Sequence, residues 1–99
     1  MARLLISECF GTNPMTREDG ARLRHLIEQY WSDQDTLVLD FAGLRIASVS
    51  FFDESLGMLA TKHPVEQLAQ RVKVENIDSQ DRRLLNSIVL SRAKERQAS

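Results

Sequence analysis

The sequence predicts a small α/β domain, in which helices pack on a mainly parallel or mixed sheet in the order β-α-β-α-β-α. Two observations predict this class. Short apolar runs typical of buried parallel strands alternate with longer segments whose apolar residues recur every three or four positions. The chain also has 99 residues, 42% of them apolar, which is enough for one hydrophobic core and not for two. We therefore treat residues 1–99 as a single domain.

The first third of the chain is predicted to form a strand, a loop and a helix. Arg3–Ser7 is a short apolar run typical of a buried strand. Cys9–Met15 contains Gly, Asn and Pro and favours a loop, although residues 8–15 leave room for an extra strand. Thr16 is a candidate N-cap, and apolar residues at three- and four-residue spacings then predict a one-faced amphipathic helix to about Trp31.

The middle of the chain contains the most apolar strand. Thr36–Phe41 is a continuous apolar run, as expected of an inner strand that is buried on both faces. Ser48 and Ser50 are both candidate N-caps for a helix over Phe51–Lys62. Pro64 then begins a further helical segment.

The last third is predicted to form a strand and a helix. Val72–Ile77 alternates in polarity, as an edge or half-exposed strand does. Ser79 is expected to cap the last helix, which should fray after Arg92 and leave residues 93–99 as a tail. The predicted core consists of Leu23, Ile27, Leu39, Leu59, Val74, Leu85 and Ile88.

The charge is unevenly distributed, although the net charge is only −1. The second half of the chain is basic, and the basic side chains gather near its end: Arg82, Arg83, Arg92, Lys94 and Arg96. A nucleic-acid-associated accessory protein that uses this basic helix is therefore the alternative function. It is the less favoured one, because the pI of about 6.1 is far from basic and no aromatic residue interleaves the cations.

The cysteine content and the hydropathy favour a cytoplasmic location. Cys9 is the only cysteine, which excludes an intrachain disulfide and a multi-cysteine zinc site. No apolar run approaches the length of about 18 residues that a membrane-spanning helix needs, and the N-terminus does not resemble a secretory signal. We expect a cytoplasmic protein that does not bind membranes.

No pattern in the sequence indicates catalysis, a metal or a cofactor. There is no glycine-rich phosphate loop, and His25 and His63 are not clustered with carboxylates. Cys9 lies beside Glu8, which should raise the thiol pKa. Asp40 ends the central strand, where parallel sheets bind ligands, but we expect it to anchor a loop. A small enzyme using Asp40 with Cys9 or a histidine is the weakest hypothesis, because no nucleophile–base pair can be named.

The segment after the central strand combines several functional signals. Ser48 and Ser50 lie at a predicted helix N-terminus, followed by Phe51, Phe52 and the acidic pair Asp53–Glu54. The serines could serve only as helix caps, and the acidic pair could serve only to stabilise the helix dipole. A phosphate added to either serine would instead be held at the helix N-terminus and would repel a partner docked there. Two glycines complete the segment: Gly43 is expected in a turn and Gly57 in close packing against the sheet.

These motifs resemble a bacterial family of STAS-like domains of unknown function, related to the STAS domains of sulphate transporters and anti-sigma-factor antagonists. The resemblance covers about residues 10–90. It is carried by a helix entered through Arg-x-x-Gly, a strand ending in Leu-Asp-Phe-x-Gly, a serine-rich helix entry and a strand ending in Asn-hydrophobic. The matching positions are Arg17 and Gly20, Leu39 to Phe41 with Gly43, Ser48 to Glu54 with Gly57, and Asn76 with Ile77. The chain has Val49 and Phe52 where a serine and a small residue are common.

The resemblance implies a non-enzymatic regulatory module that acts by binding a protein, with a histidine-kinase-like ATPase or an anti-sigma-type protein as the partner. In STAS antagonists a Ser or Thr after the central strand is phosphorylated, which switches binding off. Ser48 or Ser50 matches that position, although the Asp-Ser-Ser-Gly signature is absent. The implied contact residues are Arg45, Phe51, Phe52, Asp53 and Glu54, with one phenylalanine in the core and the other exposed as an anchor.

Overall fold

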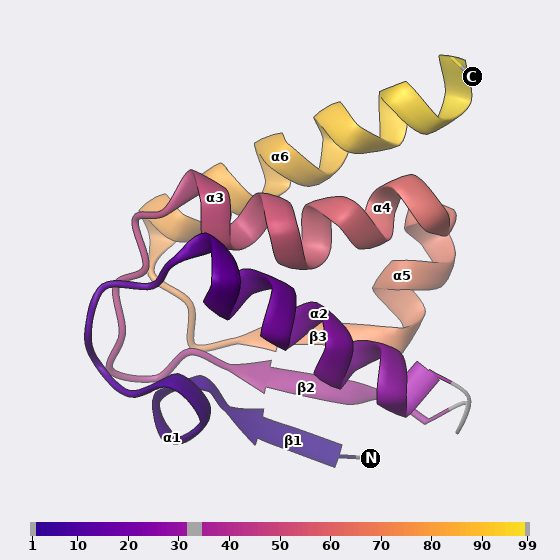
Figure 1. Ribbon diagram of the computed structural model, residues 1–99. Coiled ribbons are helices and arrows are strands. Elements are labelled where there is room, and N and C mark those ends of the chain that lie inside the picture. Colours follow the sequence, from indigo (N-terminus) through magenta and orange to yellow (C-terminus); the bar gives the residue numbers. More distant parts are fainter. Residues whose placement is uncertain (1, 32–34, 99) are drawn as a thin grey trace.

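A parallel three-stranded sheet forms the base of the molecule. The computed structural model describes residues 2–31 and 35–98. The sheet has the order β1-β2-β3, with β1 at Ala2–Leu5, β2 at Leu37–Asp40 and β3 at Val72–Glu75 (Figure 1). The register aligns Leu4 with Leu39 and Leu39 with Val74. The apolar run around Leu39 is therefore the inner strand, as predicted.

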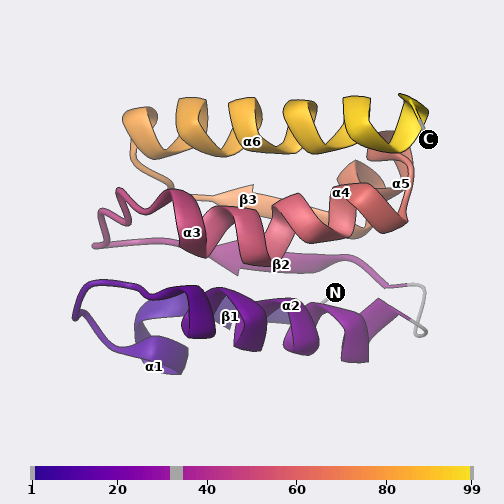
Figure 2. The ribbon, with the colours of Figure 1, turned by 45° about the horizontal axis from the view of Figure 1, so that its top comes forward.

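Most of the helices lie together on one face of this sheet, and the short helix α1 lies at the end of β1 (Figure 1). The helical segments are α1 (Ile6–Phe10), α2 (Arg17–Trp31), α3 (Val49–Phe52), the π-helical turn η1 (Asp53–Gly57), α4 (Met58–Lys62), α5 (Val65–Arg71) and α6 (Ser79–Ala98). α3, η1 and α4 follow one another without a break and lie between α2 and α6 (Figure 2). The central helical segment is thus in contact with a helix on each side and with the sheet beneath it.

The hydrophobic core lies between the sheet and these helices. It draws on α2, β2, α3, α4 and α6, and its large side chains are removed almost completely from water. Of the predicted core, five residues are buried and two are partly buried against it. The buried residues are Leu23, Ile27, Leu39, Leu59 and Leu85, and the partly buried ones are Val74 and Ile88.

Side-chain caps mark the starts of the long helices. Thr16 and Asp19 form a reciprocal capping pair, in which each side chain accepts a hydrogen bond from the other residue's backbone N–H, both at 3.1 Å. At α6 the cap is Asp78, whose Oδ2 accepts from the N–H groups of Gln80 and Asp81 at 3.0 and 3.3 Å. The prediction of Ser79 as this cap was wrong by one position, because the carboxylate of Asp78 takes both N–H groups.

Several element boundaries differ from the prediction. The first strand ends at Leu5 and not at Ser7 as predicted. The residues that follow form the short helix α1, which takes up the end of the predicted strand and the start of the predicted loop. Ile6 is fully buried in this helix, and Phe10 packs edge-on against Phe51. The strand β3 stops at Glu75, since Asn76 adopts a left-handed conformation with φ 57° that turns the chain.

The last helix is longer than predicted. It continues to Ala98, so the expected fraying after Arg92 was wrong. Arg92 is held by Asp53 and Glu95, which fixes the helix beyond this point. Ser99, the last residue of the predicted tail, lies outside the described residues. Within the described ranges, no helix has both the length and the apolar character that crossing a membrane requires.

Candidate functional site

The candidate site begins at the carboxyl end of β2. There the carboxylate of Asp40 accepts hydrogen bonds from Asn76 Nδ2 and Ala42 N, both at 3.0 Å, and from Arg3 Nη1 at 2.9 Å. The hydrogen bond from Asn76, followed by that from Ala42, lowers the pKa of Asp40. Its oxygens thus hold together three segments of the chain, and Asp40 has the loop-anchoring role that the sequence favours. Next to it, Gly43 forms the predicted turn at φ 76°.

The loop that follows is fastened by Asp81, a residue that sequence reasoning missed. Asp81 is 2% exposed, and its carboxylate accepts from Ile46 N at 2.6 Å and from Ala47 N at 2.8 Å. Ala47 has φ 48°, a conformation that costs a residue with a side chain free energy. The two charge-assisted hydrogen bonds offset this cost. No sequence signal links Asp81 to this loop, because 34 or 35 positions separate the partners.

We expect replacement of Asp81 by asparagine to lower the free energy of unfolding by about 1–3 kcal/mol. The amide has only one acceptor atom, so one of the two loop N–H groups loses its partner or faces an N–H₂ group. Urea denaturation followed by circular dichroism measures the loss. Glu66→Gln, on the exposed surface of α5, is the control. Equal stabilities of the two variants would show that Asp81 does not fasten the loop.

Beyond this loop, the two serines have different roles at the start of α3. Ser48 is the N-cap, and its Oγ accepts from Phe51 N at 3.1 Å. The Oγ atom of Ser50 lies 3.4 Å from that of Ser48, and both residues are half-buried. Between them, the side chain of Val49 is 59% exposed. The caps predicted as alternatives are therefore distinguished: Ser48 caps the helix and Ser50 does not.

An exposed surface of mixed character results, which we call the α3 entry surface and define as Arg45, Ala47, Val49 and Ser50. Arg45 and Ala47 are exposed, and the guanidinium of Arg45 donates to Gln80 Oε1 on α6. Val49 supplies the exposed apolar side chain of this surface. Sequence reasoning treated Val49 as a departure from the family pattern and did not include it among the contact residues, although its place directly after the N-cap could have indicated exposure.

The prediction of an exposed phenylalanine was wrong. Phe51 and Phe52 are both 0% exposed. Phe51 packs edge-on against Phe10 of α1, and Phe52 packs against Phe41 at the end of β2, each with ring centroids 6.2 Å apart. Adjacent helical residues point about 100° apart, and α3 has neighbours on both sides as well as beneath it. Both rings therefore lie in the core, and neither is accessible to a partner.

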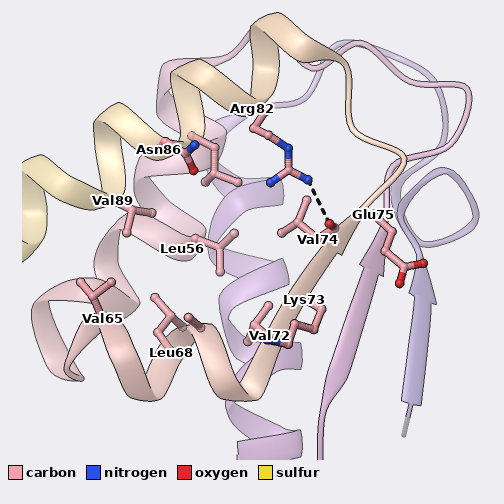
Figure 3. Close-up of a pocket in the computed structure, with 12 residues that line it drawn as sticks. Leu56, Val65, Leu68, Val72, Lys73, Val74, Glu75, Arg82, Asn86 and Val89 are labelled. Atoms are coloured by element: carbon pink, nitrogen blue, oxygen red, sulfur yellow. Dashed lines mark hydrogen bonds between the residues drawn. The ribbon is translucent and has the colours of Figure 1, made fainter.

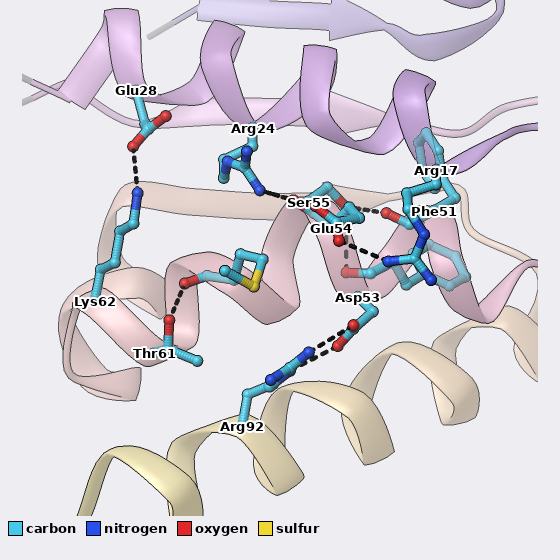
Figure 4. A network of polar contacts seen from close by, with 12 residues as sticks. Arg17, Arg24, Glu28, Phe51, Asp53, Glu54, Ser55, Thr61, Lys62 and Arg92 are labelled. Atoms are coloured by element: carbon cyan, nitrogen blue, oxygen red, sulfur yellow. Dashed lines mark hydrogen bonds and ion pairs between the residues drawn. The ribbon is translucent and has the colours of Figure 1, made fainter. Parts of the chain in front are cut away.

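The acidic pair is bound by arginines of the neighbouring helices (Figure 4). Arg92 of α6 donates from Nε and Nη2 to the two carboxylate oxygens of Asp53, both at 2.7 Å. Glu54 accepts from Arg17 at 2.6 Å and from Arg24 at 3.2 Å, and Arg24 also donates to the backbone oxygen of Glu54 at 2.8 Å. These contacts join the central helix to α2 and α6.

The same contacts shift the pKa of Asp53 and correct the predicted role of the pair. The hydrogen bond from Arg92 lowers the pKa of Asp53 and raises that of Arg92. Sequence reasoning placed Asp53 and Glu54 either at the helix dipole or against a partner. The structure instead uses both carboxylates to hold helices together, which leaves little of either side chain, 20% and 23%, exposed.

The acidic pair opens a π-helical turn, which sequence reasoning did not predict. Within it, Ser55 is fully buried and its Oγ donates to Phe51 O at 2.7 Å, which gives this carbonyl a side-chain donor where the helix widens. A Cβ on Gly57 would lie 3.0 Å from Asp53 Oδ1 and from Ile88 Cγ2. The predicted close packing at Gly57 is therefore present, but the neighbour is α6 and not the sheet.

The remaining candidate groups are not brought together. Cys9 lies on α1, where burial and the nearby Glu8 raise its thiol pKa. His63 ends α4 and stacks on Trp31 with ring centroids 4.2 Å apart, and His25 is exposed on α2. In the part of the chain that the structure describes, no three His, Cys, Asp or Glu side chains gather where they could hold a metal ion.

Three features define the class of this chain as a STAS-like α/β domain. They are the order of the strands in the sheet, the strand that ends in Leu-Asp-Phe-x-Gly, and the serine that caps the next helix. The model of the family described as STAS-like domain of unknown function (DUF4325) matches residues 19–82, and the chain belongs to this family. The matched region contains Gly20, β2, the α3 entry surface, β3 and Asp81. Searches of curated proteins and of solved structures gave no significant match.

Proposed function

We propose that this chain is a regulatory module, without catalytic activity of its own, that binds a protein through the α3 entry surface. The partner is a histidine-kinase-like ATPase or an anti-sigma-type protein. The observation that carries the proposal is Val49, a 59% exposed apolar side chain set between two serine hydroxyls at a helix start. Burial of such a side chain by a partner supplies binding free energy, and polar groups around it supply specificity.

A well-ordered surface suits this function. The carboxylate of Asp81 holds the loop before α3 by two backbone hydrogen bonds. The central helix is in turn fixed to its neighbours through Asp53 and Glu54. A surface that is ordered before binding loses less conformational entropy when the partner docks.

Ser50 is the proposed phosphoacceptor. The Oγ of Ser48 is engaged as the helix cap, whereas the one contact recorded for the Oγ of Ser50 among the described residues is with Ser48 at 3.4 Å. A phosphate on Ser50 would add a charge of about −1.5 to −2 beside Val49. A partner that covers Val49 would have to desolvate or neutralise that charge, so phosphorylation would release it.

The nucleic-acid alternative has less support in the structure. Of the basic residues near the C-terminus, Arg92 is bound by Asp53 and Glu95 within the fold, so it is not available to a phosphate group.

The proposal is tested with the partner captured from the native host and identified by mass spectrometry. We expect Ser50→Asp to weaken its binding by about tenfold or more, which corresponds to about 1.4 kcal/mol. Ser50→Ala should leave the affinity unchanged, and both variants should melt at the temperature of the parent protein. Isothermal titration calorimetry and thermal melts measure the two effects.

Variants at neighbouring positions separate docking from capping. Val49→Ser should weaken binding, whereas Leu90→Ser, a matched change at a 57% exposed position of α6, should not. Ser48→Ala should lower stability by about 0.5–2 kcal/mol through loss of the cap. Equal affinities of Ser50→Ala and Ser50→Asp for the partner would contradict the switch, and an unchanged affinity of Val49→Ser would contradict the docking surface.

A further inference from the structure

A second surface of the molecule has the properties of a peptide-binding groove. A groove of about 520 Å³ lies between α5, β3 and α6 (Figure 3). Its walls are mainly aliphatic and come from four elements: Leu56, Leu68, Val72, Val74, Leu85 and Val89. None of the residues of the α3 entry surface lines it. The groove is therefore separate from the surface to which the proposed function is assigned.

One wall of the groove is the free edge of the sheet. β3 pairs with β2 on one side, and no strand of the described ranges 2–31 and 35–98 pairs with it on the other. Phe41 N donates to Glu75 O at 3.0 Å, so the main chain of Glu75 faces β2. In a strand the main-chain groups of successive residues face opposite sides, so the groups of Val74 face the groove. An edge of this kind is a template for another extended chain.

At Val74 this edge is covered by the side chain of Arg82. The carbonyl of Val74 accepts a hydrogen bond from Arg82 Nη2 at 3.1 Å, as Figure 3 shows. Arg82 is exposed and lies in the first turn of α6, so its guanidinium can turn into solvent and uncover the carbonyl. At Val72, by contrast, the backbone N–H donates to Leu68 O at the end of α5, so Val74 is the part of the edge that Arg82 uncovers.

The rim of the groove is positively charged. Lys73 and Arg82 line it, and neither forms an ion pair within the described residues. Glu75 also lies at the rim, but its carboxylate is bound by Arg3 at 2.8 Å. A peptide segment complements this groove if its apolar side chains contact the aliphatic walls and a carboxylate contacts the basic rim.

We propose that the groove binds an extended, acidic segment of a partner protein, which adds to the sheet as a fourth strand beside β3. Alternate apolar side chains of the segment enter the groove. Its main chain bonds to the edge groups of Val74, and a carboxylate takes Arg82 away from the Val74 carbonyl. Backbone hydrogen bonds thus supply affinity, and the apolar walls and Arg82 supply selectivity.

The probe for this proposal is a random octapeptide library displayed on phage and selected on the full chain. We expect the enriched peptides to alternate apolar and polar residues and to carry Asp or Glu. On binding, the amide of Val74 should become protected from hydrogen exchange, whereas exposed amides of the loop before α3 should not. Replacing the acidic residues of an enriched peptide by lysine should lower its affinity for the chain by about tenfold.

Matched variants on adjacent positions locate the peptide. Val89→Asp places a charge in the groove and should abolish binding, while Leu90→Asp, one residue along the same helix and outside the lining, should leave it intact. Arg82→Gln should weaken acidic peptides selectively. Thermal melts followed by circular dichroism show whether the Val89→Asp variant is folded. If that variant is unfolded, Arg82→Gln provides the test of the proposal.

Four outcomes would overturn this inference. The first is the absence of any enriched peptide. The second is binding that leaves the Val74 amide unprotected, and the third is equal affinity for acidic and basic peptides. The fourth is a dimer of the free chain in light scattering with Val74 already protected, because the occupant would then be a second copy of this chain.

Discussion

Gly20→Ala is expected to lower the free energy of unfolding by about 3 kcal/mol, although alanine is the better helix former. The reason is the close approach of α2 to the start of the central helix. A Cβ on Gly20 would lie 2.5 Å from the backbone oxygen of Phe51 and 3.1 Å from the Cβ of Glu54. A backbone oxygen cannot turn aside as the end of a side chain can, so the two helices would have to separate.

Gly57→Ala is the matched control for this prediction. Its Cβ would also be crowded, but at 3.0 Å and by side-chain atoms of Asp53 and Ile88 that can shift. Its loss of stability should therefore be clearly smaller than that of Gly20→Ala in the same urea denaturation experiment. Equal losses, or a Gly20→Ala variant as stable as the parent, would mean that α2 does not approach the central helix this closely.

Leu39→Ala is expected to destabilise the fold by about 2–5 kcal/mol. Leu39 is 0% exposed, lies on the inner strand and is aligned with Leu4 and Val74 on its two sides. The helices close over it, so the surrounding structure has little freedom to fill the cavity. Chemical denaturation measures this loss in the free energy of unfolding.

Leu5→Ala in the same sheet is its control. Leu5 is 37% exposed on the edge strand β1, and its truncation should cost less than about 1 kcal/mol. A loss at Leu39 no greater than that at Leu5 would contradict the role of β2 as the centre of the core.

The order of the strands and of the longer helices could be predicted from the sequence because each of these elements has a strong local signal, whereas α1 and η1 were not predicted. The apolar run of β2 and the three- and four-residue spacing of α2 each identify their element without tertiary information. Thr16 was identifiable as a cap for the same reason, whereas the choice between Ser48 and Ser50 as the cap of the next helix required the structure. The family assignment rests on the block from Leu39 to Gly57, whose motifs are also local.

The candidate site was less predictable, because its contacts join residues far apart in the chain. The pairing of Asp53 with Arg92 spans 39 positions, and that of Asp81 with Ala47 spans 34. Spacing within one segment carries no information about such partners. The burial of both Phe51 and Phe52 likewise depends on what surrounds α3, since a helix covered on three sides buries more of its circumference than a surface helix does.

The parallel register of the sheet also has a kinetic consequence. Pairing of neighbouring strands first requires closure of a loop of roughly 35 residues. One such loop joins Ala2 to its partner Leu37, and the other joins Leu37 to its partner Val72. The helices in these loops can form transiently on their own, but no pair of strands can nucleate as a hairpin. Folding should therefore be slower than that of a helical bundle of this length, and an unpaired β2 would be the most aggregation-prone segment of the chain until β1 and β3 flank it.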